Sequence, residues 1–342
     1  MKKTLLFLMV VALLLVPSMV LLAAGQSDDG VERHAFIFKN TGNPYGDKQM
    51  QGFADGIEEL GFEAITRAPD QPTAEAQIQI IEQLITQNVA SISITGNDFD
   101  ALQPALKKAM GAGIAVLSAD SAVNPESRMT HINQADSEMI GRTLIRAAFD
   151  MADGEGDIAI LSATSQASNQ NLWIEWMKKE LDENKDKYAK MNLVRVAYGD
   201  DLRDKSVSET EALLQSFPDL KVIIAPTTVG IAAAGRVITD RGLIGDVKVT
   251  GLGLPSEMAE YIENGACPYM FLWNPIDVGY LTAYAAVAAA KGEISGEIGE
   301  SFSAGRLGDY TIEDAGDGGT QVLLGPPYRF DPSNIAEWKT VY

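Results

Sequence analysis

Short apolar runs alternate with segments of helical spacing along the chain from residue 31 onward. Runs of about four to eight residues that are rich in β-branched and aromatic side chains are typical of strands. The pattern predicts strands at residues 35–39, 62–67, 89–95, 115–118, 129–133, 157–163, 193–198, 222–225, 248–253 and 269–273.

Between these runs, apolar residues recur three or four positions apart, as on one face of a helix. Examples are Met50, Phe53, Ile57 and Leu60, and further on Ile78, Ile81, Leu84 and Ile85. Strands that alternate with helices predict an α/β fold in which helices cover parallel sheets. Ten strands exceed one comfortable doubly wound sheet, so we expect two similar α/β lobes that divide after the fifth strand, at residues 133–138.

Polar side chains follow five of the predicted strands, at the edge where open parallel sheets bind their ligands. They are Lys39, Asn40, Asn43, Asp120, Ser121, Asn169, Gln170, Pro226, Thr227, Thr228, Trp273 and Asn274. Amides donate and accept hydrogen bonds, carboxylates accept and lysine donates, so this set suits a sugar or polyol better than a phosphate. The competing interpretation is that such residues are ordinary helix caps and turn formers. Because five strand ends in two lobes carry them, we expect them to converge on one cleft.

Composition limits the partners of the protein. The formal net charge is -20 over 342 residues, and no Lys/Arg cluster interrupts it, so we expect no nucleic-acid partner. The single cysteine, Cys267, cannot form an internal disulfide and is expected to be a small buried hydrophobic residue. With only two histidines, a Cys/His metal cluster is excluded.

A secretory signal peptide is predicted at residues 1–24. Lys2 and Lys3 precede an apolar run that ends in small residues at Ala24, before the polar sequence GQSDDG. The competing interpretation is an uncleaved membrane anchor, because the run approaches the length that spans a bilayer. No cysteine stands at the end of the run, which excludes a lipobox. We therefore expect the mature protein in a bacterial periplasm.

The predicted cleft offers little catalytic chemistry. No strand end carries a histidine, and the sequence has no G-x-S-x-G elbow, P-loop or G-x-G-x-x-G after a strand. A glycosidase would need a carboxylate pair, and only Asp120 and Asp277 are expected near the cleft. The stretch 313–319, EDAGDGG, lacks the ligand ladder of a calcium loop and is expected to be a solvated turn. We expect no metal, no cofactor and no turnover, but a carrier that binds and releases.

Eight stretches in order resemble the type I periplasmic solute-binding proteins of sugar ABC transporters. They are KNTGNPYGDKQMQGF, RAPDQPTAEAQIQIIEQLI, GNDFDALQPALKKAM, DSAVNPESRMTHINQAD, SATSQASNQNLWIEWMKKEL, IIAPTTVGIAAAGR, GLGLPSEMAEYIENG and LWNPIDVGYL. Each stretch alone is weak evidence for the family, but their occurrence in this order makes the resemblance specific. Within this family, the chain is most similar to the rhamnose-binding branch, which is close to the receptors for autoinducer-2 (AI-2).

The resemblance implies two Rossmann-like lobes with parallel sheets, joined by a hinge of three segments. The implied N-terminal lobe covers 31–134 plus 274–298, and the implied C-terminal lobe covers 135–273 plus 299–342. The chain would cross between the lobes near Gln134, return near Asn274 and cross again after Ile294. Closure on a ligand and delivery to a membrane permease are further implications, and the competing function is a signalling receptor.

The resemblance also implies the pocket. Lys39, Asp120, Gln170 and Pro226 match pocket positions of the AI-2 receptors, whereas Asn169 replaces an aspartate and Thr228 replaces an alanine. A mismatched ligand would leave buried polar groups unpaired, so the changes at Asn169 and Thr228 favour rhamnose over AI-2.

Aromatic residues and one lysine complete the expected site. The resemblance implies that Trp273 or Tyr45 packs against the C–H face of a sugar ring. Trp173 fits the buried side of a helix at 172–181, so we expect it in the core. Lys39 lies near a helix start, where the helix dipole disfavours a cation. A specific partner is therefore predicted for Lys39, and Asp120 is the candidate.

Overall fold

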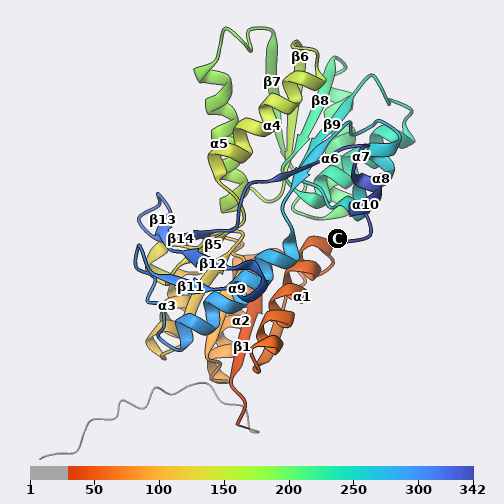
Figure 1. Cartoon of the computed structure of the whole chain (residues 1–342). Coiled ribbons are helices and arrows are strands. Elements are labelled where there is room, and N and C mark those ends of the chain that lie inside the picture. Colours follow the sequence, from red (N-terminus) through yellow and green to blue (C-terminus); the bar gives the residue numbers. More distant parts are fainter. Residues whose placement is uncertain (1–29) are drawn as a thin grey trace, which may run out of the picture.

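The computed structural model describes residues 30–342, which form two lobes (Figure 1). The predicted signal peptide, residues 1–24, lies outside the described residues. The ten predicted strands all occur. The first lobe contains β1 (Arg33–Ile37), β2 (Glu63–Arg67), β3 (Ser91–Ile94), β4 (Ala115–Ala119), β5 (His131–Asn133), β11 (Ser301–Ser303), β12 (Asp309–Thr311), β13 (Glu313–Asp314) and β14 (Thr320–Leu323), with helices α1 (Pro44–Glu59), α2 (Ala74–Thr86), α3 (Gln103–Gly111) and α9 (Pro275–Ala290).

The sheet of the first lobe has the order β13-β14-β5-β4-β3-β1-β2, and its strands are parallel except that β13 runs antiparallel to β14. Alternate residues of β1 enter different cores: Phe36 packs in a core that includes Phe53 and Ile57 of α1, whereas Ile37 packs in a core that includes Ile81 of α2. Because both faces of β1 are covered by helices, the chain from residue 35 to residue 38 is a continuous apolar run instead of an alternating one.

The second lobe contains β6 (Gly156–Ser162), β7 (Met191–Tyr198), β8 (Leu220–Ala225), β9 (Lys248–Gly251), β10 (Met270–Leu272) and β15 (Tyr328–Phe330), with helices α4 (Ser137–Met151), α5 (Ser168–Glu183), α6 (Arg203–Ser216), α7 (Thr228–Asp240), α8 (Pro255–Glu263) and α10 (Ile335–Trp338). Its parallel sheet has the order β7-β6-β8-β9. The two α/β lobes predicted from the alternation are confirmed. Cys267 is buried, as predicted.

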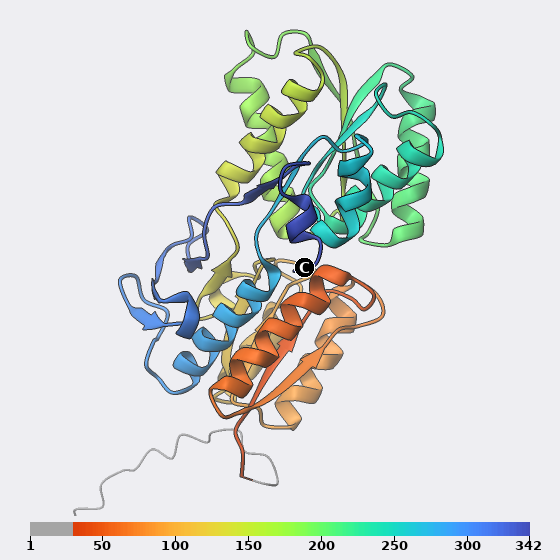
Figure 2. The ribbon, with the colours of Figure 1, turned by 45° about the vertical axis from the view of Figure 1, so that its right-hand side comes forward.

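Helices α1 and α9 pack closely against each other beside the interlobe region (Figure 2). A Cβ atom at Gly52 would lie 2.0 Å from the carbonyl oxygen of Ile276, and one at Gly279 would lie 2.0 Å from that of Gln49. Both contacts are far shorter than a van der Waals contact, so only glycine permits this approach. The pair places the first turns of α1 and α9, capped by Asn43 and Asn274, near the cleft.

Three segments connect the lobes: residues 134–136 between β5 and α4, 273–274 between β10 and α9, and 324–327 between β14 and β15. The expected assignment of 299–342 to the C-terminal lobe is wrong for its first part. Strand β14 continues the first lobe's sheet, with Val322 beside Ile132, and β11 contacts α9. Backbone pairing therefore assigns residues up to Leu323 to the first lobe.

The acidic stretch 313–319 is largely exposed, but it is more than a solvated turn. Its first two residues form β13, and the carboxylate of Asp317 lies 2.6 Å from the guanidinium of the buried Arg128. This ion pair fixes the hairpin to the edge of the sheet. A purely local reading of the sequence could not find a partner so distant along the chain.

Candidate functional site

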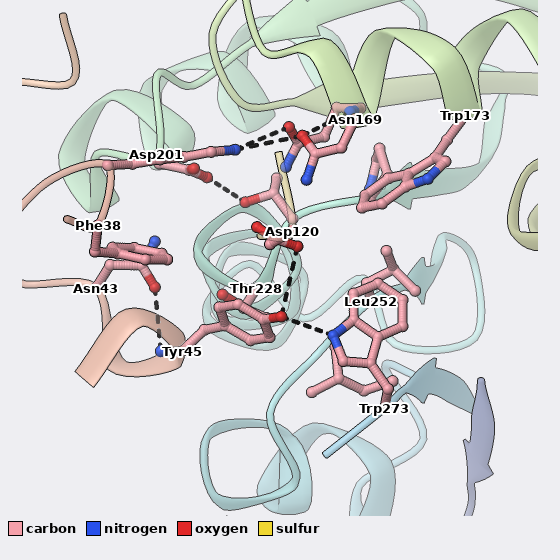
Figure 3. Close-up of a pocket in the computed structure, with 15 residues that line it drawn as sticks. Phe38, Asn43, Tyr45, Asp120, Asn169, Trp173, Asp201, Thr228, Leu252 and Trp273 are labelled. Atoms are coloured by element: carbon pink, nitrogen blue, oxygen red, sulfur yellow. Dashed lines mark hydrogen bonds between the residues drawn. The ribbon is translucent and has the colours of Figure 1, made fainter. Parts of the chain in front are cut away.

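A cavity lies between the lobes, at the carboxyl ends of strands from both sheets (Figure 3). About 360 Å³ of space between the side chains is not filled by atoms, and part of this space is continuous with solvent. Its walls are Phe38, Lys39, Asn43, Tyr45, Asp120, Asn169, Gln170, Trp173, Asp201, Pro226, Thr227, Thr228, Leu252, Leu272 and Trp273. The predicted convergence of strand ends therefore occurs in the structure.

Lys39 follows β1 and reaches across the cleft to the second lobe. It is 4% exposed, and its Nζ donates to Asn169 Oδ1 at 3.3 Å and to Gln170 Oε1 at 3.4 Å. Asp120 was the expected partner, but these direct hydrogen bonds go to the two amides. The reason is position: Asn169 and Gln170 lie in the first turn of α5 and face Lys39 across the cleft.

Asp120 follows β4 and is almost completely buried. Its φ angle is 62°, in the left-handed region, which is strained for most residues and tolerated by aspartate. Burial raises the pKa of Asp120 to about 6; the Lys39 cation opposes this increase, and the Asp201 carboxylate adds to it. Asp120 is therefore a carboxylate whose charge is sensitive to nearby donors.

Tyr45 connects Asp120 to Trp273 (Figure 3). The indole Nε1–H of Trp273 donates to the Tyr45 hydroxyl oxygen at 2.7 Å, and that hydroxyl donates to Asp120 Oδ1 at 3.5 Å. Burial, together with the charge of Asp120, raises the pKa of Tyr45 well above its usual value. The phenol therefore stays neutral and acts as a hydrogen-bond donor to the carboxylate.

Asn169 is the most heavily bonded amide in the cavity wall. Its Oδ1 accepts from Ser121 Oγ at 2.7 Å, from the backbone N–H of Gln170 at 2.8 Å and from Lys39 Nζ. Three donors at one atom identify it as the oxygen. Its Nδ2 is buried and has no hydrogen-bond partner among the described residues. An amide donor is therefore available at this position of the cavity wall.

Asp201 was missed by the sequence analysis, although the same strand-end rule could have found it after β7. It is buried, its φ angle is 53°, and its Oδ1 accepts a hydrogen bond from Thr227 Oγ1. Thr227 precedes α7, whose first residue is Thr228, so the end of β8 and the end of β7 meet here. The cavity thus contains two carboxylates, those of Asp120 and Asp201.

Aromatic and aliphatic side chains form the other side of the cavity, where Figure 3 shows Trp173, Leu252 and Trp273 together. The rings of Trp173 and Trp273 pack edge to face with centroids 5.8 Å apart. Trp173 was expected in the core. It is indeed buried, but it also lines the cavity, and its Nε1–H has no partner among the described residues. Helical spacing could not distinguish these two roles.

Three predicted residues do not line the cavity. Ser121 lies behind the wall and donates to Asn169, as described above. Asn274 caps α9 by accepting from the backbone N–H of Ile276 at 3.0 Å, so the capping interpretation holds for it. Asn40 is buried and donates to the Thr41 carbonyl oxygen at 3.1 Å. Asn43, in contrast, serves as a helix cap and as a wall residue, because it caps α1 and also lines the cavity.

Residues 30–342 include two histidines and one cysteine. The cavity wall contains no histidine or cysteine. Within the same part of the chain, no three His, Cys, Asp or Glu side chains gather closely enough to hold a metal ion. No helix in the described part of the chain is both long and apolar enough to cross a membrane.

The sequence model of the periplasmic binding protein domain matches residues 34–294. The chain belongs to the periplasmic binding protein family. This membership confirms the resemblance found in the ordered motifs, and it places the cavity between the lobes of a binding protein. The relatives and solved structures named below are binding proteins, so the family evidence does not indicate an enzyme.

This periplasmic binding protein is 48% identical to a solute-binding protein of an ABC transporter from Clostridium phytofermentas with bound L-rhamnose. The match covers 91% of this chain and 99% of that one, with a TM-score of 0.89. LsrB from Clostridium saccharobutylicum in complex with AI-2 is 22% identical over 90% of this chain and 99% of that one, with a TM-score of 0.84, and shares the fold.

A curated relative is the D-ribose/D-allose-binding protein of Pseudomonas aeruginosa, which is 27% identical over 200 residues. That match covers 56% of this periplasmic binding protein and 60% of the relative. The chain therefore spans less than two thirds of the length of this relative. The comparison supports membership of the family but does not indicate which ligand this chain binds.

Proposed function

We propose that the protein is the solute-binding component of a sugar ABC transporter and that its ligand is L-rhamnose. The observation that carries this proposal is the 48% identity, over 91% of the chain, to a solute-binding protein with bound L-rhamnose. The periplasmic location, the signal peptide at residues 1–24 and the partnership with an inner-membrane permease belong to the same proposal. A net charge of -20 fits the expectation that nucleic acid is not a partner.

The cavity supports a sugar on chemical grounds. Free donors at Asn169 Nδ2 and Trp173 Nε1 stand beside the acceptors of Asp120 and Asp201. Sugar hydroxyls both donate and accept, so one ring can engage all of these groups. The apolar side, where Trp173 meets Trp273, is suited to the C–H face of a sugar ring and to the methyl group of a deoxyhexose.

The proposed binding residues come from both lobes and from the hinge. Lys39, Asn43, Tyr45 and Asp120 belong to the first lobe, Asn169, Gln170, Pro226 and Thr228 to the second, and Trp273 to a connecting segment. A ligand that contacts both faces stabilises the closed arrangement through its differential affinity for that state. Ser121 and Asn274 support the site by bonding Asn169 and capping α9.

Asp120 and Asp201 raise the question of a hydrolase, since two carboxylates share the cavity. One oxygen of Asp201 is engaged by Thr227, and Lys39, Asn169 and Gln170 supply binding groups instead of a proton relay. We therefore propose binding without turnover. Recovery of chemically unchanged sugar after incubation tests this part of the proposal.

A thermal-shift screen of the protein without residues 1–24 tests the choice of ligand. Its panel contains L-rhamnose, other deoxyhexoses, D-ribose and AI-2. A ligand that binds only the folded state raises the melting temperature by mass action. We expect the largest shift with L-rhamnose and no shift in the Asp120→Ala variant. A shift with AI-2 alone would reject the rhamnose proposal and would support the signal-receptor alternative.

A further inference from the structure

Two buried amides outside the cavity wall support its first-lobe side. Gln77 lies on α2 and is fully buried, and Asn97 follows β3 and is 3% exposed. Neither residue lines the cavity. Both side chains donate hydrogen bonds to backbone carbonyls of the segment that carries Lys39.

Gln77 binds the ends of two neighbouring strands at once. Its Nε2 donates to the carbonyl oxygen of Phe38 at 3.1 Å and to that of Thr95 at 2.8 Å. Its Oε1 accepts from the backbone N–H of Asn97 at 2.9 Å. Both hydrogens of the amide and its oxygen are therefore engaged, which fixes the rotamer of Gln77 and the spacing of the two strand ends.

Asn97 holds the next carbonyl along the loop. Its Nδ2 donates to the carbonyl oxygen of Lys39 at 2.8 Å and to that of Thr73, the cap of α2, at 3.4 Å. The paired region of β1 ends at Ile37, so the carbonyls of Phe38 and Lys39 lie beyond the strand pairing. Side-chain amides therefore take the place of the missing ladder partners at the point where the ligand loop begins.

The same network reaches the loop of Asp120. The backbone N–H of Gly96, next to Asn97, donates to the carbonyl oxygen of Ser121 at 3.1 Å. Ser121 directly follows Asp120 and donates through its hydroxyl to Asn169. A displacement of Asn97 would thus affect both charged groups that the first lobe presents to the cavity.

We propose that Gln77 and Asn97 are positioning residues that set the distance between the Lys39 loop and the Asp120 loop and so determine the affinity for the ligand. This inference rests on the proposed function, because L-rhamnose is the probe. The amides touch no ligand and act through Lys39 and Asp120. Loss of the Gln77 amide removes the donor to the carbonyls of Phe38 and Thr95, and loss of the Asn97 amide removes the donor to the carbonyl of Lys39. The Lys39 loop then shifts to find new partners for its buried carbonyls.

The test combines Gln77→Met with Lys39→Met in a double-mutant cycle, measured by calorimetry with L-rhamnose. Gln79 offers a matched control, because it lies on the same helix and is exposed. We expect Gln77→Met to weaken binding about tenfold or more, the size of effect that one buried hydrogen bond produces. When Lys39→Met is already present, we expect a further loss clearly smaller than tenfold, limited to the part that acts through Asp120, and we expect no change for Gln79→Met.

A merely structural role predicts a different pattern. Gln77→Met would then lower the melting temperature and leave the dissociation constant unchanged well below that temperature, or would weaken binding equally in both backgrounds. Either result overturns the inference. If Gln77→Met does not fold, Asn97→Ala replaces it in the same cycle with the same expectations.

Failure of the proposed function is seen separately, as an absence of L-rhamnose binding by the unsubstituted protein. The inference is then decided without ligand by crystal structures of the unsubstituted protein and of Gln77→Met. Loss of the contact between Lys39 Nζ and Asn169 Oδ1 in the variant supports a positioning role. Retention of that contact at its present 3.3 Å rejects it.

Discussion

Replacement of Asp120 by asparagine tests the electrostatics of the proposed site. Burial raises the pKa of Asp120 to about 6 in the ligand-free cavity. Sugar hydroxyls that donate to the carboxylate favour its ionised form, so affinity should rise with pH until the ligand-free group is fully ionised. Near pH 5 only about one carboxylate in eleven is ionised, and L-rhamnose should bind about tenfold more weakly there than near pH 8.

The Asp120→Asn variant keeps the shape of the side chain and removes its titration. A hydrogen bond to a charged acceptor contributes about 1.5–3 kcal/mol, so the variant should bind about ten- to 150-fold more weakly near pH 8. Its affinity should vary little with pH over the same range, because the group that titrates is gone. Calorimetry with L-rhamnose at several pH values, on both proteins without residues 1–24, measures these quantities.

Asp240→Asn serves as the control, since Asp240 is at the end of α7, far from the cavity wall, and its carboxylate is largely exposed. That variant should reproduce the affinity and the pH profile of the unsubstituted protein. The reasoning is refuted if affinity falls as pH rises through 6, which would mean that the ligand prefers the protonated acid. It is also refuted if Asp120→Asn retains the tenfold pH effect.

Three further predictions concern the aromatic wall, a buried histidine and the helix pair. Trp273→Phe removes the indole donor to Tyr45 and should weaken L-rhamnose binding by about 1 kcal/mol in calorimetry; unchanged binding would contradict the role of that bond. Burial and the Arg128 charge lower the pKa of His131 to about 3, below its unfolded value, so this group stabilises the fold above about pH 6.5 and loses that contribution on acidification. Urea unfolding should show a smaller loss of stability from pH 7 to pH 4.5 in His131→Asn than in the unsubstituted protein, and equal losses would refute the assignment. Gly279→Ala should cost about 1–3 kcal/mol of unfolding free energy because its Cβ meets the Gln49 carbonyl, whereas Gly111→Ala, which faces open space, should be neutral or slightly stabilising; similar unfolding midpoints for the two would count against the helix contact.

The regular part of the fold was predictable because its signals are local. The strands β1, β4 and β8 are buried along most of their length, so each contains an apolar block between helical patterns, whereas the equally buried β3 alternates serine and isoleucine. The strands after α9 were not found. They are two to four residues long and mostly polar, and the strand that joins the first lobe's main sheet, β14, pairs with residues almost 200 positions away, as for Val322 and Ile132.

The site was predictable to the extent that it follows strand ends. Nine of the twelve residues expected after strand ends line the cavity, because parallel strands deliver their next residues to one edge. The expected interaction between Lys39 and Asp120 is present as an attraction between charges, but the direct hydrogen bonds of Lys39 go to Asn169 and Gln170. Strand order alone does not tell which group across the cleft is nearest. Trp173 shows a second limit: one buried indole can serve both the core and the cavity wall.

A calorimetric titration of the protein without residues 1–24 with L-rhamnose, in parallel with AI-2, tests the central proposal most directly. The account predicts saturable one-to-one binding of L-rhamnose, strongly weakened in Asp120→Asn, with the sugar recovered unchanged. No heat of binding with L-rhamnose, together with saturable binding of AI-2, would contradict the proposed ligand and the interpretation of Asn169 and Thr228.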